Sequence, residues 1–537
     1  MNNDIEISKS SKKDNIVDIA KTIGIEKEDL ILFGDYKAKI KKNLDNPKGK
    51  LILVTAISPT PFGEGKTTVS IGLSDALHKM NKNVIATLRE PSMGPVFGMK
   101  GGSTGGGYSQ VVPMEDINLH FTGDFHAITS ANNLISAAID NHIYFGNSLD
   151  IQNVTFNRCL DVNDRALREV EVKGRKDSFS ITSASEVMAL FCLATSLDDL
   201  RKRLGDIIIG TNSKDEFVYV RELNIEGSLM ALLKDAFLPN LVQTLEKTPV
   251  LIHGGPFANI AHGCNSISAT KTALSIADYV VTEAGFGADL GAEKFFNIKC
   301  RVGNLKPDTV VLVSTIKALK YHGGVKKDEI FENNIEALKE GFANLDKHYD
   351  NITKFGINPI VCLNKYNTDT KEEVEVLRKH CEEKGYIFTI STAYTDGSKG
   401  AMDLAEKVLE NKNSSFNLLY DEDDSIIDKI NKVCKEIYGA SKVNISEDIK
   451  SKIDILNKNN MANLPICVAK TQYSFSDDSK KVGVPTDFEV SVKDIRLYGG
   501  AKFITVLLGD IMVMPGLSRK PNYELIDVVD GEIINLS

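Results

Sequence analysis

The hydrophobic pattern at residues 50–80 predicts a buried strand, a short loop and a helix. Residues 51–57 form a mostly apolar run that is rich in β-favouring side chains, and the turn-forming residues 58–65 end it. From Lys66 onward, apolar side chains recur three or four positions apart, at Val69, Leu73, Ala76, Leu77 and Met80. This spacing aligns them along one side of a helix.

Short apolar segments and helical patterns then alternate along most of the chain, which is typical of an α/β fold with a mostly parallel sheet covered by helices on both faces. Beyond residue 420 the rhythm changes to two helical patterns followed by strands, which favours an α+β unit. The predicted strands are 83–95, 249–253, 278–283, 308–313, 357–363, 386–390, 488–492 and 503–508, and the predicted helices include 127–141, 183–204 and 371–384.

A chain of 537 residues is too long for one hydrophobic core, so the sequence predicts several domains. We expect a nucleotide-binding α/β domain at residues 1–302, a smaller α/β domain at 303–420 and a C-terminal α+β domain at 421–537. The acidic stretch 414–425 is the best candidate for a linker, and its charges indicate a solvated connection rather than a site.

The composition, with 42% hydrophobic and 26% charged residues, is ordinary for a globular protein. No targeting segment or membrane-spanning run is evident, so we expect a cytoplasmic protein with no membrane partner. The eight cysteines form no C-x-x-C pair, which argues against a disulfide framework or a zinc ribbon and favours small buried side chains. The net charge of −9 argues against a nucleic-acid partner.

The loop TPFGEGKTT compares with the phosphate-binding motif G-x-x-x-x-G-K-[ST], although Thr60 stands where the first glycine belongs. Gly63 and Gly65 allow backbone N–H groups to turn toward a phosphate. Lys66 would then reach the β- and γ-phosphates, and the hydroxyl of Thr67 would bind Mg²⁺. The alternative is a glycine-containing turn with an exposed lysine. The strand before the loop and the helix after it favour the phosphate site.

Other polar residues follow predicted strands, where open α/β sheets bind ligands. Arg89 and Glu90 end one of them. Glu283 ends another, either as an acid near Mg²⁺ or as a cap for the next turn. The glycine-rich run 98–110 is either a flexible surface loop or a backbone surface for close ligand approach, and the sequence leaves both open.

Two further groups carry weaker signals. Asn364, Lys365 and Asp369 resemble a base-reading N-K-x-D signature whose spacing is too long, which is weak evidence for guanine. A metal site built on His253, His262 and Cys264 would lack its remaining ligands at a useful spacing, so structural zinc is disfavoured.

Several long motifs occur together in an order that resembles the formate–tetrahydrofolate ligase family, over nearly the whole chain. The motifs are TPFGEGKTT from Thr60, LREPSMGPVFGMKGGSTGGGYSQVVPMEDINLHFTGD from Leu88, TEAGFGADLGAEKF from Thr282, VSTIKALKYHGG from Val313 and MPGL from Met514. The resemblance implies an enzyme of one-carbon metabolism that makes formyl phosphate from ATP and formate, transfers the formyl group to tetrahydrofolate, and releases ADP and phosphate.

The resemblance also implies roles for individual residues. Lys66 would bind the γ-phosphate, Arg89 would hold formate and formyl phosphate, Glu90 would face the folate, and Asp124 would lie near the reacting groups. The family further implies Mg²⁺, activation by a monovalent cation, and a homotetramer. The nucleotide loop would comprise Thr60, Pro61, Phe62, Gly63, Glu64, Gly65, Lys66, Thr67 and Thr68.

The chain departs from the family pattern at a few positions. Ser103 and Thr104 replace two alanines, and Lys317 replaces an arginine. The phenylalanine and tryptophan that enclose the pterin ring correspond to Tyr366 and Tyr394, which keep an aromatic face but a smaller one. Alternatively, either tyrosine packs at a domain edge.

A second class of function shares the same loop, namely a P-loop nucleotide switch or chaperone-type ATPase that acts on a protein partner. Lys66 cannot separate the two hypotheses. Three other features can separate them, because a nucleotide switch does not require them: Arg89, the glycine-rich run and the tyrosine pair.

Overall fold

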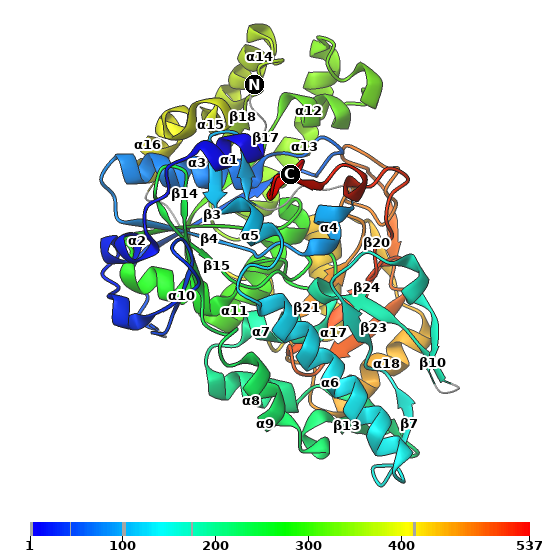
Figure 1. The fold of residues 1–537 in the computed structure, drawn as a ribbon. Helices are drawn as coiled ribbons and strands as arrows, with labels where there is room; N and C mark the ends of the chain where they lie inside the picture. Colours follow the sequence, from blue (N-terminus) through cyan, green and yellow to red (C-terminus); the bar gives the residue numbers. More distant parts are fainter. Residues whose placement is uncertain (1–3, 43, 99–103, 173–174, 412–414, 537) are drawn as a thin grey trace.

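The computed structural model describes residues 4–42, 44–98, 104–172, 175–411 and 415–536. The described residues build a twelve-stranded sheet (Figure 1). From β15 to β19 in the order below, every pairing is parallel. The predicted α/β class and mostly parallel sheet are therefore confirmed. The order is β1 (Leu30–Leu32), β2 (Ala38–Ile40), β14 (Asn240–Thr244), β15 (Pro249–Ile252), β4 (Val84–Leu88), β16 (Tyr279–Glu283), β3 (Lys50–Ala56), β17 (Pro307–Ser314), β18 (Ile360–Asn364) and β19 (Ile387–Ser391), with β5 (Gly105–Gly106) and β6 (Ser109–Val112) joined through β14.

Strand β3 supplies side chains to both faces of the sheet because successive residues point to opposite sides. Leu51 and Leu53 join a core cluster that includes helices α10 (Ile267–Ile276) and α13 (Ile335–Thr353). The residues between and after them, Ile52, Val54 and Ala56, join a second cluster with α3 (Lys66–Lys79) and α16 (Met402–Glu410). Helices therefore cover both faces, and α3 begins at Lys66 of the candidate phosphate loop (residues 60–68), which is called the phosphate loop below.

The helix predicted at 183–204 is interrupted. Helix α7 (Glu186–Leu193) and helix α8 (Leu197–Gly205) replace it, since the Ser196 hydroxyl caps α8 by accepting a hydrogen bond from Asp199 N. The other predicted helices are confirmed as α6 (Asp124–Tyr144) and α14 (Lys371–Glu383).

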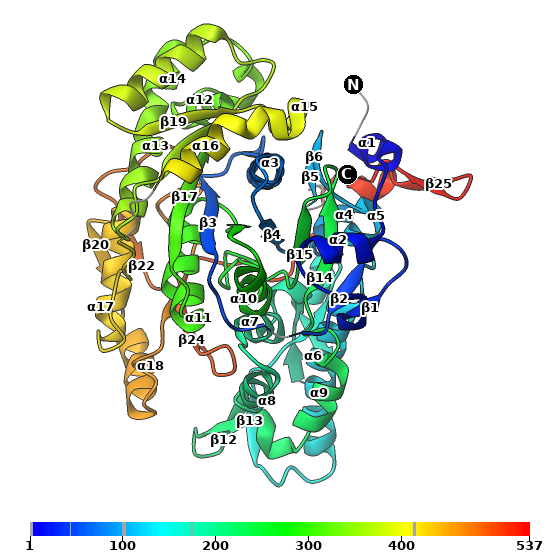
Figure 2. The same cartoon turned by 90° about the vertical axis from the view of Figure 1, so that its left-hand side faces the viewer.

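Residues 124–237 form a lobe around a further hydrophobic core, which the regular alternation of strands and helices did not predict. Its main helices are α6, α7, α8 and α9 (Glu226–Leu233), and its edge is formed by β7 (Ile151–Val154), β12 (Ile208–Asn212) and β13 (Phe217–Tyr219). The lobe lies at the lower end of the molecule in Figures 1 and 2.

The C-terminal segment contains α17 (Ile426–Asn431) and α18 (Glu447–Lys458), followed by a sheet of β21 (Ile466–Ala469), β24 (Phe503–Leu507) and β23 (Asp494–Tyr498). The parallel pairing of β17 with β3 crosses the predicted boundary at residue 303, and one core cluster contains residues from all three predicted segments. The division into three domains stays a prediction.

The two ends of the chain meet beside the sheet, as Figure 2 shows. Helix α1 (Asp4–Ser10) contacts a C-terminal hairpin of β25 (Asp527–Val529) and β26 (Glu532–Ile534), where Lys9 Nζ lies 2.7 Å from Glu532 Oε2. Among the described helices, none has the length and apolar character needed to cross a membrane.

Candidate active site

The predicted site residues follow parallel strands and therefore meet at one edge of the sheet. The phosphate loop follows β3, Arg89 and Glu90 follow β4, Glu283 ends β16, and Asn364 ends β18. Strand β16 lies between β4 and β3, so its acidic end separates the arginine from the lysine loop. This edge is where open α/β sheets bind ligands.

The phosphate loop is held by contacts within itself and from β18. Its glycines Gly63 and Gly65 adopt φ of +75° and +71°, which disfavours side chains. The Glu64 carboxylate accepts hydrogen bonds from Thr60 N at 2.7 Å and Thr60 Oγ1 at 3.1 Å. Asn364 Nδ2 donates to Glu64 O at 3.0 Å and would lie 2.2 Å from a Cβ placed on Gly65. The loop therefore fits only glycine at residue 65.

Lys66 and Thr67 begin α3 and are both half-buried. Burial holds the pKa of Lys66 below its ordinary value, and the nearby charge of Arg89 adds to this shift, while Glu64 and Glu283 oppose it. Thr67 Oγ1 donates to Glu283 Oε2 at 2.9 Å. A hydroxyl paired with a carboxylate at a phosphate loop is the oxygen-rich environment that suits Mg²⁺. Glu283, for which the sequence left open a place near Mg²⁺ or a turn cap, therefore contacts Thr67 through its side chain.

The remaining loop residues surround this position. Pro61 is exposed, and Thr68 is buried in the first turn of α3. Phe62 packs edge-to-face against Tyr321, with ring centroids 6.2 Å apart. These contacts attach the loop to α12 (Ile316–His322) on the neighbouring strand connection.

Arg89 has hydrogen-bonding capacity to spare. Its Nη1 donates to Pro256 O at a long 3.4 Å, and its buried Nε has no hydrogen-bond partner among the described residues. Gly285 lies against the guanidinium, since a Cβ there would be 3.0 Å from Nη1. A planar guanidinium with unused donors suits a carboxylate or phosphate.

Glu90 and Asp124 form a buried acidic pair with different partners. Glu90 Oε2 has no hydrogen-bond partner in the described part of the chain, and burial raises the pKa of Glu90 well above its ordinary value, with the charge of Asp124 adding to the effect. Asp124 lies 2.8 Å from Lys39 Nζ and accepts a hydrogen bond from Asn240 Nδ2 at 2.7 Å. Both oxygens of Asp124 are thus engaged, and Glu90 is the carboxyl group with a free oxygen.

Tyr366 and Tyr394 approach the loop from the ends of β18 and β19. Tyr366 is half-buried, and Lys317 Nζ lies 4.0 Å from its ring centroid. Burial raises the pKa of Tyr366 to about 12, helped by the proximity of Glu64 and Tyr394. Tyr394 is 44% exposed, and its hydroxyl donates to Asp4 Oδ1 at 3.1 Å. The two rings therefore lie near each other and near the phosphate loop.

The described part of the glycine-rich run packs closely against the segment that carries Tyr394. Tyr108 N donates to Tyr394 O at 2.8 Å, and a Cβ on Gly107 would lie 2.0 Å from that carbonyl oxygen. Thr104 is buried, whereas residues 99–103, including Ser103, lie outside the described residues. In this part, the glycines permit close backbone packing.

Most of the weaker sequence candidates have internal partners. His253 is buried between Ser266 Oγ at 2.6 Å and Ala236 O at 2.8 Å. Neither ring nitrogen of His262 has a hydrogen-bond partner among the described residues, and burial lowers the pKa of His262 to about 3. Asp369 Oδ2 accepts a hydrogen bond from Tyr366 N at 2.8 Å, which caps a turn. Sequence reasoning treated Asn364 as a weak base-reading signal and missed that its amide holds the phosphate loop. A polar residue that ends a buried strand was the available clue.

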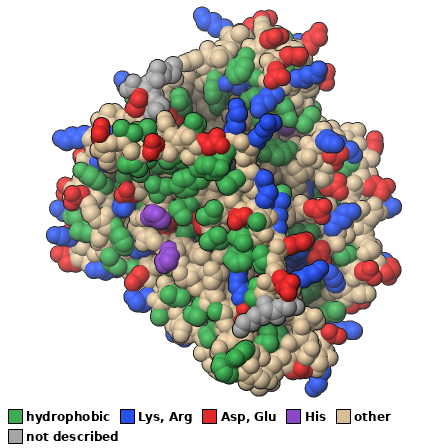
Figure 3. Space-filling model, turned by 45° about the vertical axis from the view of Figure 1, so that its right-hand side comes forward, with side chains coloured by type: hydrophobic (Ala, Val, Ile, Leu, Met, Phe, Trp, Pro, Cys, Tyr) green, Lys and Arg blue, Asp and Glu red, His purple; other side chains and the backbone are tan. Residues whose placement is uncertain are grey.

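The surface combines both signs of charge. Figure 3 shows acidic and basic side chains interspersed over one face, with Lys and Arg side chains gathered along a hollow near its middle. All eight cysteines are buried and unbridged, which confirms their prediction as small core side chains.

Comparison with protein families identifies the family of the chain and, with it, the class of reaction. A family model described as formate–tetrahydrofolate ligase matches residues 2–537. The match spans nearly the whole chain, including each motif that carries the resemblance, and it implies ATP and tetrahydrofolate as substrates. The chain belongs to the formate–tetrahydrofolate ligase family and is a ligase.

Proposed function

We propose that this protein joins formate to tetrahydrofolate through formyl phosphate and releases ADP and phosphate. The observation that carries the proposal is the meeting of Lys66, Arg89 and the Thr67–Glu283 pair at one sheet edge. Two cationic side chains there are suited to two anionic substrates, ATP and formate. The family match gives no support to the alternative of a nucleotide switch.

In the first step, a formate oxygen attacks the γ-phosphorus of ATP while the bond to the β-phosphate oxygen breaks. Backbone N–H groups of the glycine loop and the N-terminus of α3 would bind the phosphates. Lys66 would stabilise the charge that spreads over the transferred group. Arg89 would orient formate through paired hydrogen bonds from its unused donors.

Thr67 and Glu283 fit the role of holding Mg²⁺, because together they offer a hydroxyl and a carboxylate oxygen next to the loop. When bound, Mg²⁺ would neutralise negative charge on the β- and γ-phosphates. We also expect activation by a monovalent cation, by family resemblance. Equal initial rates in potassium and choline chloride would contradict that expectation.

In the second step, an amine nitrogen of tetrahydrofolate attacks the carbonyl carbon of formyl phosphate. The new C–N bond forms as the C–O bond to phosphate breaks, and the amine loses a proton. Burial raises the pKa of Glu90 well above its ordinary value, and this carboxyl group would exchange the proton that the amine loses. Asp124, held by Lys39 and Asn240, would act as a positioning residue for Glu90.

Tyr366 and Tyr394 would bind the pterin ring between their faces. Aromatic stacking contributes roughly 0.5 to 1.5 kcal/mol per pair. Formyl phosphate hydrolyses readily, so water must be kept out between the two steps. The tyrosines lie beside the phosphate loop, and a folate bound there would cover the loop.

The test is ADP release by the purified protein. We expect ADP only when ATP, formate and tetrahydrofolate are all present. Lys66→Ala should abolish this release and leave tetrahydrofolate binding, measured by calorimetry, within about twofold of the wild type, because the lysine contacts phosphate rather than folate. ATP turnover without formate and folate, stimulated by a protein, would instead support the switch hypothesis.

We further propose a homotetramer, by family resemblance. Sedimentation velocity should then give four times the chain mass of 58.9 kDa. A monomeric mass at micromolar concentration would contradict this assembly.

A further inference from the structure

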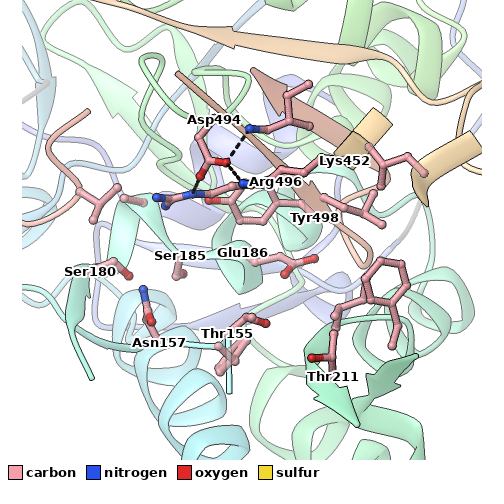
Figure 4. Close-up of a pocket in the computed structure, with 18 of the residues that line it drawn as sticks. Thr155, Asn157, Ser180, Ser185, Glu186, Thr211, Lys452, Asp494, Arg496 and Tyr498 are labelled. Atoms are coloured by element: carbon pink, nitrogen blue, oxygen red, sulfur yellow. Dashed lines mark hydrogen bonds and ion pairs between the residues drawn. The ribbon is translucent and has the colours of Figure 1, made fainter. Parts of the chain in front are cut away.

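A cavity of about 600 Å³ lies between the lobe and the C-terminal segment, apart from the candidate active site. Its walls come from the segment after β7, the start of α7, strands β12 and β13, helix α18 and strand β23. Figure 4 shows side chains from these elements converging on one space. The volume lies in the range of about 300 to 1,000 Å³ that is typical of small-molecule sites.

Apolar and aromatic side chains form much of the wall. The rings of Phe217 and Tyr498 and the aliphatic side chains of Ile208, Leu456 and Leu497 line the cavity. Flat rings bind aromatic ligands by stacking, and such contacts do not require a charge on the ligand.

Glu186, the first residue of α7, projects its carboxyl group into this space (Figure 4). Its Oε1 accepts hydrogen bonds from Gly500 N at 2.7 Å and Ala501 N at 3.3 Å. Its Oε2 has no partner among the described residues, although the residue is only 9% exposed. Burial raises the pKa of Glu186 to about 8, so this carboxyl group is mostly protonated at neutral pH and Oε2 can donate a hydrogen bond.

Two other polar side chains face the same space without partners in the described part of the chain. Ser180 Oγ and the amide of Asn157 lie next to each other on one side of Glu186 (Figure 4). Ser180 is 7% exposed. These groups face the open space of the cavity, and together they can both donate to and accept from a ligand.

The charges at the edge of the cavity are already paired. Asp494 lies 2.5 Å from Lys452 Nζ and 3.3 Å from Arg496 Nε, and Figure 4 shows the three side chains together. Since the shared carboxylate satisfies both cations, an anionic ligand would have to compete with Asp494. An uncharged ligand avoids this competition.

We propose that this cavity is a second ligand site, which binds a small uncharged aromatic molecule carrying an amide-like group that hydrogen-bonds to Glu186 and Ser180. The rings of Phe217 and Tyr498 bind its aromatic part, and the amide-like group supplies hydrogen-bond partners to the polar side chains that face the cavity. This site is separate from the ligase chemistry, because none of the candidate active-site residues lines it.

The experiment titrates 2-naphthamide and its anionic analogue 2-naphthoate into the purified full-length protein by calorimetry. We expect 2-naphthamide to bind at least about tenfold more tightly, because its amide group both donates and accepts hydrogen bonds, whereas the carboxylate of 2-naphthoate has no donor and loses its hydration on entering the cavity. Failure of both probes to bind, or tighter binding of 2-naphthoate, would overturn the proposal.

Variants locate the binding in the cavity. Thr155→Trp puts a large ring at an exposed wall residue and should abolish 2-naphthamide binding. Gln152→Trp adds the same ring to an exposed position on β7 outside the wall and should leave the affinity within about twofold. Equal affinity in Thr155→Trp and in the wild type would place the probe elsewhere and refute the assignment.

Glu186 is tested with two further substitutions. Glu186→Gln keeps an acceptor for the Gly500 and Ala501 amides and an N–H donor toward the cavity, so binding should persist. Glu186→Ala should weaken binding about tenfold, the scale of one hydrogen bond to a buried group. Melting temperature and ligase activity report whether each variant is folded. A tenfold loss in a folded Glu186→Gln protein would contradict hydrogen bonding by a neutral side chain.

Discussion

At the scale of single residues, the partners of a side chain decide what it can do. Asp124 and Glu90 are both buried acids, yet Asp124 is bound by Lys39 and Asn240, while Oε2 of Glu90 has no hydrogen-bond partner among the described residues. The buried Nε of Arg89 also lacks a partner in the described part of the chain. We therefore assign the substrate contacts to Arg89 and Glu90 and a supporting role to Asp124.

Replacing Arg89 by lysine tests whether the paired geometry of the guanidinium matters. We expect Arg89→Lys to reduce kcat/KM for formate by about a hundredfold, since one ammonium cannot supply two parallel hydrogen bonds to a carboxylate. Steady-state kinetics with varied formate measure this loss. Arg201→Lys, at an exposed position of α8, is the matched control and should behave as the wild type. Wild-type rates in Arg89→Lys would refute the role.

A local motif predicted Lys66 and Thr67 as site residues, and the family resemblance predicted roles for Arg89 and the two tyrosines. It could not identify Asn364 as a support of the phosphate loop, because the amide and its acceptor Glu64 lie 300 residues apart. Contacts of this kind depend on strand order, which local patterns do not encode. The pairing of Lys39 with Asp124 was missed for the same reason.

At the scale of elements, the loop and helix after β3 form a unit that is fixed from several sides. Asn364 holds the loop from β18, and Thr244 and Thr248 of the β14–β15 turn both donate hydrogen bonds of 2.6 Å to Asp75 in the middle of α3. The helix is therefore attached to the sheet at its start and at its centre. Both attachments can be tested separately.

Gly65→Ala should raise KM for ATP strongly and lower the melting temperature. The substitution combines a φ of +71° with a Cβ only 2.2 Å from Asn364 Nδ2, so the loop must move. Gly24→Ala is the matched control, because its φ of +72° is the same while nothing lies within 4 Å of the added Cβ. It should cost about 1 kcal/mol of stability and leave KM unchanged. Equal KM values for ATP in the two variants would show that the clash has no consequence.

Asp75 makes the stability of α3 depend on pH. Burial raises the pKa of Asp75 from 3.8 to about 7, so the folded protein binds a proton more tightly than the unfolded chain. Stability should therefore fall as the pH rises from about 4 through 7 and stay low above 7. Asp75→Asn keeps an acceptor for the threonine hydroxyls and removes the charge. Because one pKa unit corresponds to about 1.4 kcal/mol, it should gain up to about 4 kcal/mol at pH 8.

Urea unfolding at pH 5 and pH 8 measures this effect. The difference between Asp75→Asn and the wild type should be large at pH 8 and small at pH 5. A constant difference at both pH values would mean that Asp75 does not titrate in this window.

The regular elements of the central sheet follow from local apolar patterns, which is why the strands and helices around Lys66 lie where the sequence predicts them. The sequence patterns did not predict the lobe at residues 124–237, because its short strands and helices follow no single hydrophobic period along the chain. The break between α7 and α8 depends on one capping serine, which a hydrophobic pattern cannot register.

At the scale of the whole molecule, the two ends of the chain support the segment that follows Arg89. Asn522 N donates to Gly98 O at 2.7 Å, and Asn522 Nδ2 donates to Val96 O at 3.0 Å. Leu536 packs with Ile5 and Val96 in a small core cluster. Residues 522–536, which include the C-terminal hairpin, therefore hold helix α4 (Met93–Phe97) next to the candidate active site.

Deletion of residues 521–537 should lower the melting temperature by several degrees and raise KM for formate more than KM for ATP. The buried Leu536 alone contributes roughly 1.5 to 3 kcal/mol, and α4 loses both of its contacts with Asn522. Lys9→Ala is the control, because ion pairs of partly exposed lysine contribute little. Unchanged kinetics after the deletion would contradict the supporting role of the hairpin.

The strand order also sets when the catalytic centre becomes complete during synthesis. Strand β16 lies between β4 and β3 in the sheet and therefore sets the separation of Arg89 and Lys66. Both residues precede β16 in the sequence, since this strand begins only at Tyr279, so a ribosome translates them first. A nascent chain released before that residue carries both cations without the strand that sets their separation. Copies of the chain that end before Tyr279 therefore lack one structural element of the candidate active site.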